Sequence, residues 1–290
     1  MCLAAWRCAP HTGLPWGLVS NRDEFHDRPA APLAWWTDGP GGRGWLGGRD
    51  LQAGGTWLGL DPRGRLALLT NVREPAPPRA DAVSRGDLVL QALRHGLDDG
   101  HWMAAELRRP RHGWNLLQLD LAGTAGRWWS NRPQPTLRVL GAGTHGLSNA
   151  ALDTPWPKVR RLCRALNTAC AEAQALPLDG GPGPGRRAAP SPRIERLFAH
   201  LWAALADRWQ PPDAQLPHTG VPWPLEQALA PVFIHRPATP GRAAYGTRSS
   251  TVLVVEQRGA RPWLHLRERR FDAAGQPCGG AAWDGPLRVD

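Results

Sequence analysis

The stretch CLAAWRCAPHTGLPWGLVSNRDEF, residues 2–25, decides how this chain folds. Two apolar segments, residues 3–8 and 16–20, are separated by a short segment rich in Pro and Gly, which predicts two strands joined as a hairpin. A run of polar and ionisable residues follows residue 20, where we expect the second strand to end. The end of that strand lies beside the start of the first, so Arg22 and Asp23 are expected near Cys2.

The rest of the sequence alternates between groups of predicted strands and groups of predicted helices. Short apolar or alternating segments predict strands over residues 44–48, 56–61, 65–71, 114–120, 126–129, 136–141, 251–257 and 263–271. Helical spacing predicts helices over residues 88–96, 100–107, 159–166, 194–205 and 224–229, the third of them capped by Asp153 or Thr154.

This order predicts an α+β fold in which the first and last strands share one sheet and the helices pack outside it. A doubly wound fold would require a stricter alternation of strands and helices. We treat residues 1–290 as one domain, interrupted by a Pro- and Gly-rich surface loop at about residues 176–192.

The composition excludes several classes of protein. Of 290 residues, 42% are hydrophobic and 21% are charged, which is enough to bury a large core. The net charge is +10, but no block of about five or six like charges occurs, and we expect no nucleic-acid partner. The five cysteines form no CxxC pair, so we expect neither a metal site nor a disulfide framework. No apolar run reaches about eighteen residues and no signal-peptide layout opens the sequence, so we expect no membrane span and a cytoplasmic location.

Cys2 differs from the other cysteines because it follows the initiator Met. Removal of Met1 would leave one residue that carries both a thiol and an α-amino group, with reference pKa values of about 8.5 and about 8. Such a residue combines a nucleophile with a base near neutral pH. Arg22 would stabilise the thiolate, and Asp23 would orient the amino group.

Two alternatives stay open from the residues alone. Position 2 can simply tolerate cysteine, and the polar run can be a solvated turn whose surface ion pairs contribute little to stability. Adjacent residues in an extended segment also point to opposite faces, so Arg22 and Asp23 need not both face Cys2. Asp27 or Glu24 would then take the place of Asp23.

Short motifs distributed over residues 1–256 resemble the NRDE family, and they are similar to those of bacterial relatives of the eukaryotic transport and Golgi organisation protein 2. The motifs are MC at 1–2, NRDE at 21–24, RP at 28–29, GGTWLG at 54–59, TN at 70–71, SRG at 84–86, SNR at 130–132, GLSN at 146–149, TPWPK at 154–158 and YGTRSST at 245–251. Their joint occurrence in one order makes the resemblance specific.

The resemblance implies an αββα four-layer sandwich of the N-terminal-nucleophile hydrolase type. It also implies a catalytic set in which Cys2 is the nucleophile, two asparagines form an oxyanion hole and an arginine precedes a late strand: Cys2, Arg22, Asp23, Asn71, Asn149 and Arg248. Four further residues of the same motifs are expected to contact the substrate: Asn21, Glu24, Arg28 and Trp57. A structural role as packing or turn residues is the alternative for Trp57 and the two asparagines.

Two functions follow from this resemblance. The first is a cysteine amidohydrolase that cleaves a non-peptide C–N amide bond of a small substrate through a thioester, with no cofactor. The second is a non-catalytic protein that binds or traffics haem or lipid/acyl-CoA on the same fold, in which Cys2 and His26 could contact iron. A basic scaffold for protein partners is a third, weaker reading. The first two differ in whether Cys2 is required.

Overall fold

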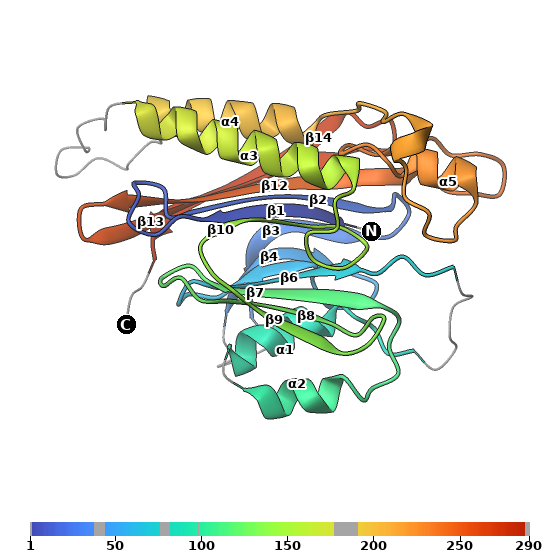
Figure 1. Ribbon diagram of the computed structural model, residues 1–290, viewed down its shortest axis with the longest axis horizontal. Coiled ribbons are helices and arrows are strands. Elements are labelled where there is room, and N and C mark those ends of the chain that lie inside the picture. The colour runs from blue at the N-terminus through green and yellow to red at the C-terminus, as the bar shows by residue number, and fades with distance from the viewer. Residues whose placement is uncertain (1, 38–43, 76–81, 98, 177–190, 288–290) are drawn as a thin grey trace.

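The computed structural model describes residues 2–37, 44–75, 82–97, 99–176 and 191–287. Two seven-stranded antiparallel sheets stack face to face, and helices cover the outer face of each sheet (Figure 1). The layers therefore follow the order helix, sheet, sheet, helix. This arrangement confirms the α+β class and the αββα four-layer sandwich that the sequence predicts.

The first sheet joins both ends of the chain. Its strands lie in the order β10 (Gly143–Leu147), β1 (Cys2–Cys8), β2 (Trp16–Phe25), β12 (Tyr245–Arg258), β13 (Arg261–Phe271) and β14 (Pro277–Pro286), and β11 (His235–Arg236) pairs with β12. The pairing of β2 with β12, which includes Val19 opposite Val252, confirms that the first and last strands share a sheet.

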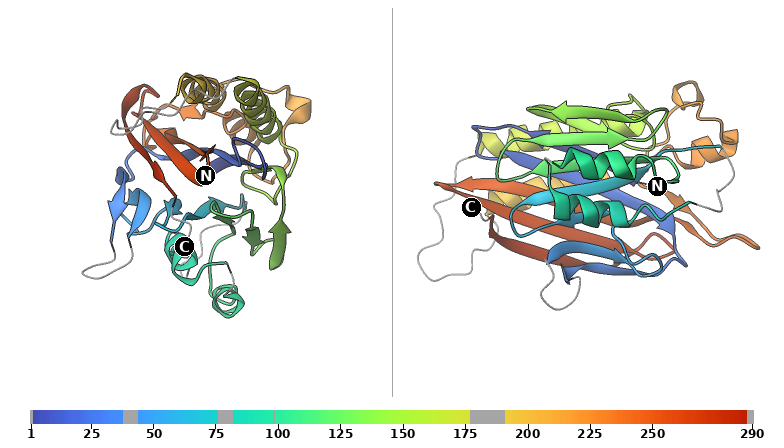
Figure 2. Two further views of the ribbon diagram at one scale, coloured as in Figure 1. Left: turned by 90° about the vertical axis from the view of Figure 1, so that its left-hand side faces the viewer. Right: turned by 90° about the horizontal axis from the view of Figure 1, so that it is seen from below.

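The second sheet and the helices are built from the middle of the chain. This sheet contains β3 (Ala30–Trp36), β4 (Trp45–Asp50), β5 (Leu58–Leu60), β6 (Arg65–Asn71), β7 (Trp114–Asp120), β8 (Gly126–Ser130) and β9 (Thr136–Leu140), in that order. The helices are α1 (Asp87–His95), α2 (Gly100–Glu106), α3 (Pro157–Ala175), α4 (Pro192–Leu205) and α5 (Trp223–Ala228), with a 3₁₀ turn at Asp213–Gln215. Figures 1 and 2 show α3 and α4 over the first sheet and α1 and α2 over the second.

Alternation along β1 divides its side chains between two cores. Ala4 and Trp6 pack between the two sheets, whereas Leu3 and Ala5 pack under α3 and α4. Both faces of the strand are therefore buried, which explains why its sequence is almost continuously apolar. None of the described helices is long and apolar enough to cross a membrane.

Three expectations about local structure were wrong. The polar run after Ser20 continues as β2 to Phe25, because β12 pairs with it to its end and β1 pairs with it as far as Arg22. Helix α3 begins at Pro157 without a side-chain cap, and Asp153 instead accepts the Gly146 N–H at 2.9 Å. Strands β3, β10, β11 and β14 were not predicted. Almost all of the predicted loop at 176–192 lies outside the described residues.

Candidate active site

One cavity of about 400 Å³ gathers most of the predicted site residues. It opens where β1 begins and β2 approaches its end, and both sheets contribute to its walls. The predicted residues that line it are Cys2, Arg22, Asp23, Glu24, Arg28, Trp57 and Asn71. The other three, Asn21, Asn149 and Arg248, are not part of the lining.

Cys2 and Arg22 form a directly opposed pair in the antiparallel ladder of β1 and β2. Opposed residues share a face of the sheet, so both side chains face the layer between the two sheets. They are almost fully buried, with 8% and 5% of their surface exposed. Burial raises the pKa of the Cys2 thiol, Asp23 raises it further and Arg22 opposes both effects. The resting thiol therefore requires a base before it can attack.

The second sheet holds Arg22 in place. Its Nη2 lies 3.5 Å from Asp50 Oδ2, and its guanidinium stacks 4.3 Å above the Trp57 ring. Arg28 Nε donates to the same Asp50 oxygen at 2.7 Å. Burial alone would raise the pKa of Asp50, but the hydrogen bonds from Arg28 and the Ala53 N–H hold it below its usual value. Asp50 thus stays ionised and balances two arginines.

A glycine on β4 makes room for the Trp57 ring. A Cβ atom added to Gly48 would lie 2.4 Å from two carbons of that ring, which no real contact allows. The Trp57 ring therefore packs against β4 at Gly48, and the Arg22 guanidinium lies over that ring. This contact gives Trp57 a positioning role at the cavity wall.

Asp23 approaches the same cavity from the opposite face of β2. Its Oδ1 accepts a hydrogen bond from Thr247 Oγ1 at 2.7 Å, beside a β-bulge in β12. Arg22 and Asp23 therefore point to opposite faces of β2, as expected for adjacent residues in a strand. Both still line the cavity, because the cavity lies at the edge of the sheet where β1 begins. Burial raises the pKa of Asp23, whereas the charge of Lys158 lowers it.

Lys158 is a buried charge that interacts with Asp23 from behind the cavity lining, and sequence reasoning did not place it there. It is the only lysine in the chain, it lies in the first turn of α3 and only 3% of its surface is exposed. Its Nζ donates to the Leu229 carbonyl at 3.0 Å. Burial lowers the pKa of Lys158 to about 8, although the charges of Asp23 and Cys2 oppose this shift. The signals in the sequence were its place at the end of the TPWPK motif and its uniqueness among many arginines.

Lys158→Met is expected to change the pH dependence of stability with a definite sign. The pKa falls from 10.5 to about 8 on folding, so between these values the unfolded chain holds a proton that the folded chain lacks. The free energy of unfolding of the unaltered chain should therefore rise relative to the variant, by about 3 kcal/mol across this window. Urea unfolding of both proteins at pH 7.5 and pH 10 measures the difference. A constant difference would contradict the buried ionisable lysine.

The two predicted oxyanion-hole asparagines occupy different places. Asn71 ends β6 on the cavity wall, and its side chain has no hydrogen-bond partner among the described residues. Asn149 lies behind it with 1% of its surface exposed, and its Nδ2 donates to the Asn71 carbonyl at 2.8 Å. The Asn149 Oδ1 accepts from Ser148 Oγ at 3.2 Å. Asn71 can therefore donate to a ligand, whereas Asn149 holds the Asn71 backbone.

Two other predicted residues bind protein groups outside the cavity. Asn21 Nδ2 donates to the carbonyls of Leu205 and Val232, both at 2.9 Å, and so ties β2 to the end of α4. Arg248 Nη1 donates to the Phe25 carbonyl at 3.1 Å and to the Arg28 carbonyl, which fixes the turn between β2 and β3.

The segment 82–86 forms a wall of the cavity and carries Ser84 and Arg85. The Thr56 N–H donates to the Gly86 carbonyl at 3.1 Å, which attaches the segment to the second sheet. Arg111 is fully buried, and its guanidinium bonds the Ser84 carbonyl and the Asp87 carboxylate. The sequence identified this segment only as a family motif, and its role depends on these long-range contacts.

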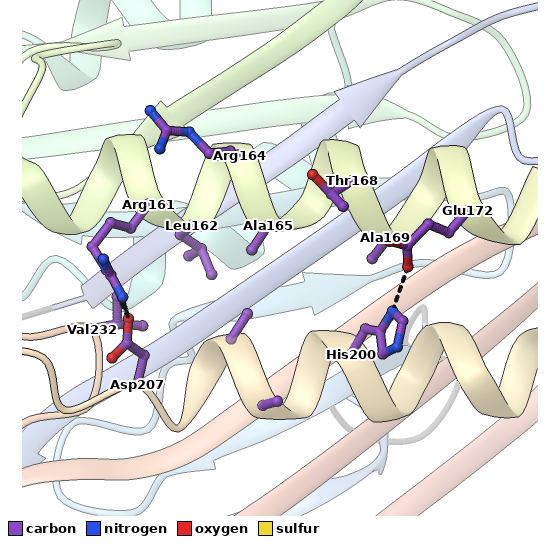
Figure 3. A pocket seen from close by; sticks show the side chains of 12 residues that line it. Arg161, Leu162, Arg164, Ala165, Thr168, Ala169, Glu172, His200, Asp207 and Val232 are labelled. Carbon is purple, nitrogen blue, oxygen red and sulfur yellow. Dashed lines mark hydrogen bonds and ion pairs between the residues drawn. The ribbon is translucent and has the colours of Figure 1, made fainter.

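A second cavity, of about 570 Å³, lies between α3 and α4 on the outside of the first sheet (Figure 3). Arg161 pairs with Asp207 at 2.6 Å at one end, and Glu172 pairs with His200 at 2.9 Å farther along the two helices. None of the predicted site residues lines this cavity. The cavity at Cys2 is therefore the candidate active site.

Comparisons with known protein families and curated proteins point to one family. A family model described as Transport and Golgi organisation 2 matches residues 1–273. Homologues of the Transport and Golgi organization 2 protein from Mus musculus, Bos taurus and Homo sapiens are 31%, 33% and 32% identical, each over 83% of this chain and 82% of its own length. The crystal structure of the C2A mutant of conjugated bile acid hydrolase from Clostridium perfringens aligns with a TM-score of 0.38 and 9% identity, over 100% of this chain and 97% of that one.

Proposed function

This chain belongs to the Transport and Golgi organisation 2 family, and we propose that it is an amidohydrolase whose nucleophile is the Cys2 thiol. The substrate would be a small molecule with a non-peptide C–N amide bond. The observation that carries the proposal is the cavity that gathers a buried cysteine, an arginine, an aspartate and an asparagine: Cys2, Arg22, Asp23 and Asn71. The Asn71 side chain has no hydrogen-bond partner among the described residues. A nucleophile, charge-balancing groups and an oxyanion donor are what amide cleavage requires.

The proposed reaction needs Met1 to be removed so that Cys2 carries the α-amino group. This amine takes the thiol proton, and the thiolate attacks the amide carbon to form a tetrahedral oxyanion, which the Asn71 Nδ2 group stabilises. The α-ammonium then gives its proton to the leaving nitrogen as the C–N bond breaks and a thioester forms. Water hydrolyses the thioester and restores the thiol. Asp23 keeps the amino group in position, and Arg22 balances the thiolate charge.

A reactive amide probe tests this assignment through the intact mass of the purified protein. We expect the mass to lack Met1 and to increase by one acyl adduct that maps to Cys2. Burial raises the pKa of Cys163 to about 12 and that of Cys170 to about 11, so neither should compete. Cys278 is exposed, and a Cys278→Ala control removes its background labelling. A retained Met1, or labelling that persists in Cys2→Ala, would rule out the N-terminal nucleophile.

A non-catalytic binding function predicts a different result when the unaltered protein is compared with Cys2→Ala. A protein that binds haem or lipid/acyl-CoA can retain ligand when Cys2 becomes Ala, whereas a hydrolase loses turnover. The side chain of His26 does not line the cavity of Cys2, so the two residues are not brought together as a pair of iron ligands there. The geometry around Cys2 therefore supports the hydrolase in preference to an iron ligand pair.

A further inference from the structure

Arg85 is the cavity-lining arginine that forms no ion pair with a carboxylate of the described residues, although the charges of Glu24 and Glu74 act on it through space. Arg22 and Arg28 share Asp50, at 3.5 Å and 2.7 Å. Arg85 is half-buried, and its guanidinium makes one hydrogen bond in the described part of the chain, from Nη1 to the Gly113 carbonyl at 3.1 Å. A guanidinium has five N–H donors, so most of those of Arg85 have no hydrogen-bond partner among the described residues and can bind a ligand in the cavity.

The backbone that carries Arg85 is rigidly mounted. The Gly86 carbonyl accepts a hydrogen bond from the Thr56 N–H, and the Ser84 carbonyl accepts one from the Arg111 guanidinium. Both neighbours of Arg85 are therefore hydrogen-bonded to buried groups. A partly buried cation without a counter-ion loses solvation, and this cost is offset when an anion completes the site. A prearranged site also binds an anion without the cost of ordering a loop.

From this arrangement, the geometry points to a substrate that carries an acidic group, carboxylate or phosphate, bound by the Arg85 fork while the amide carbon lies at Cys2. The planar fork of arginine matches either group with two parallel hydrogen bonds. Glu24 lines the same cavity, and its Oε1 accepts the Phe25 N–H at 3.0 Å. Its negative charge should weaken binding of an acid and so provides a second, opposite test. The inference rests on the proposed function for the reaction, but its binding test does not need turnover.

The test uses the full chain with Cys2→Ala, which binds without reacting, and calorimetry with three matched amides. Succinamate carries a carboxylate, 3-phosphonopropionamide carries a phosphonate and succinamide is neutral. We expect at least one acid to bind more tightly than succinamide, and the tighter of the two identifies the acidic group. Adding Arg85→Met should weaken binding of that acid by about 10- to 100-fold and leave succinamide within about twofold.

Two further variants test whether the effect on acid binding is specific to Arg85. Arg160→Met removes one positive charge from the exposed face of α3 and should not change either affinity, whereas Glu24→Gln should tighten binding of the acid. Equal affinity for the acids and succinamide, including no detectable binding, would overturn the inference, as would an equal loss for acid and neutral amide in Arg85→Met. Acid-selective binding without turnover by the unaltered chain would instead reject the proposed function alone, and turnover without acid preference would reject the inference alone.

Discussion

Cys2→Ala is expected to abolish amide hydrolysis, with a loss of about 10⁴-fold or more in kcat/KM, because no other group in the cavity can form the thioester. The other residues that line the cavity would still bind the substrate, so KM should change little. The measurement is product release by the unaltered and variant proteins, each with its N-terminal mass verified.

Cys8→Ala is the matched control for this experiment. Cys8 is buried on the same strand and the same face as Cys2, but it lies at the opposite end of β1 in the core between the sheets. We expect this variant to keep turnover within about threefold, because it removes a core thiol and touches no residue of the cavity. Turnover that survives Cys2→Ala, or that is lost equally in both variants, would exclude Cys2 as the nucleophile.

Gly55→Ala is expected to damage both stability and the cavity. A Cβ atom at this position would lie 2.4 Å from the carbonyl carbon and oxygen of Gly86. Backbone cannot move aside as a flexible side chain can, so the segment that carries Arg85 must shift and the bond from Thr56 to Gly86 must break. We expect a loss of about 2–3 kcal/mol in the free energy of unfolding, measured by urea denaturation.

Gly100→Ala is the control that separates the steric clash between Gly55→Ala and Gly86 from the general effect of replacing a glycine. Gly100 is the first residue of α2, and no atom lies within 4 Å of the Cβ it would gain. The variant should be as stable as the unaltered chain or more stable by up to about 1 kcal/mol, because alanine favours a helix. Equal stability of the two variants would show that the contact between Gly55 and Gly86 does not constrain the fold.

Local patterns predicted the strands best where pairing and burial agree with them. Strands β6 and β7 have the predicted bounds, Arg65–Asn71 and Trp114–Asp120, because each is a short apolar run in the middle of the second sheet. Strand β14 was missed because glycines and exposed residues occupy most of it, and β13 alone holds it in the sheet. Pairing with a neighbour thus created a strand that no periodicity indicated.

The extension of β2 shows the same limit within the site. Residues 21–24 are charged or polar, and local preference favours a turn there. Pairing with β12, and with β1 as far as Arg22, keeps them extended, and all but Glu24 are buried. This pairing also explains how Arg22 reaches the second sheet while Asn21 bonds the end of α4. The sequence of one strand predicts which side chains share a face, but it does not predict which other elements of the fold those side chains contact.

The sequence by itself determined the class of the fold and placed Arg22 and Asp23 near Cys2, because hydrophobic periodicity and the hairpin pattern are properties of neighbouring residues. The resemblance to a known family supplied the other lining residues that were expected, among them Trp57 and Asn71. The tertiary structure alone decided that Asp50 balances Arg22, that Lys158 is buried near Asp23 and that Arg85 lines the cavity without an ion pair to any described carboxylate. These relations join segments far apart in the chain. Burial and Coulomb interactions depend on distance in space, so they exist only after the two sheets have stacked.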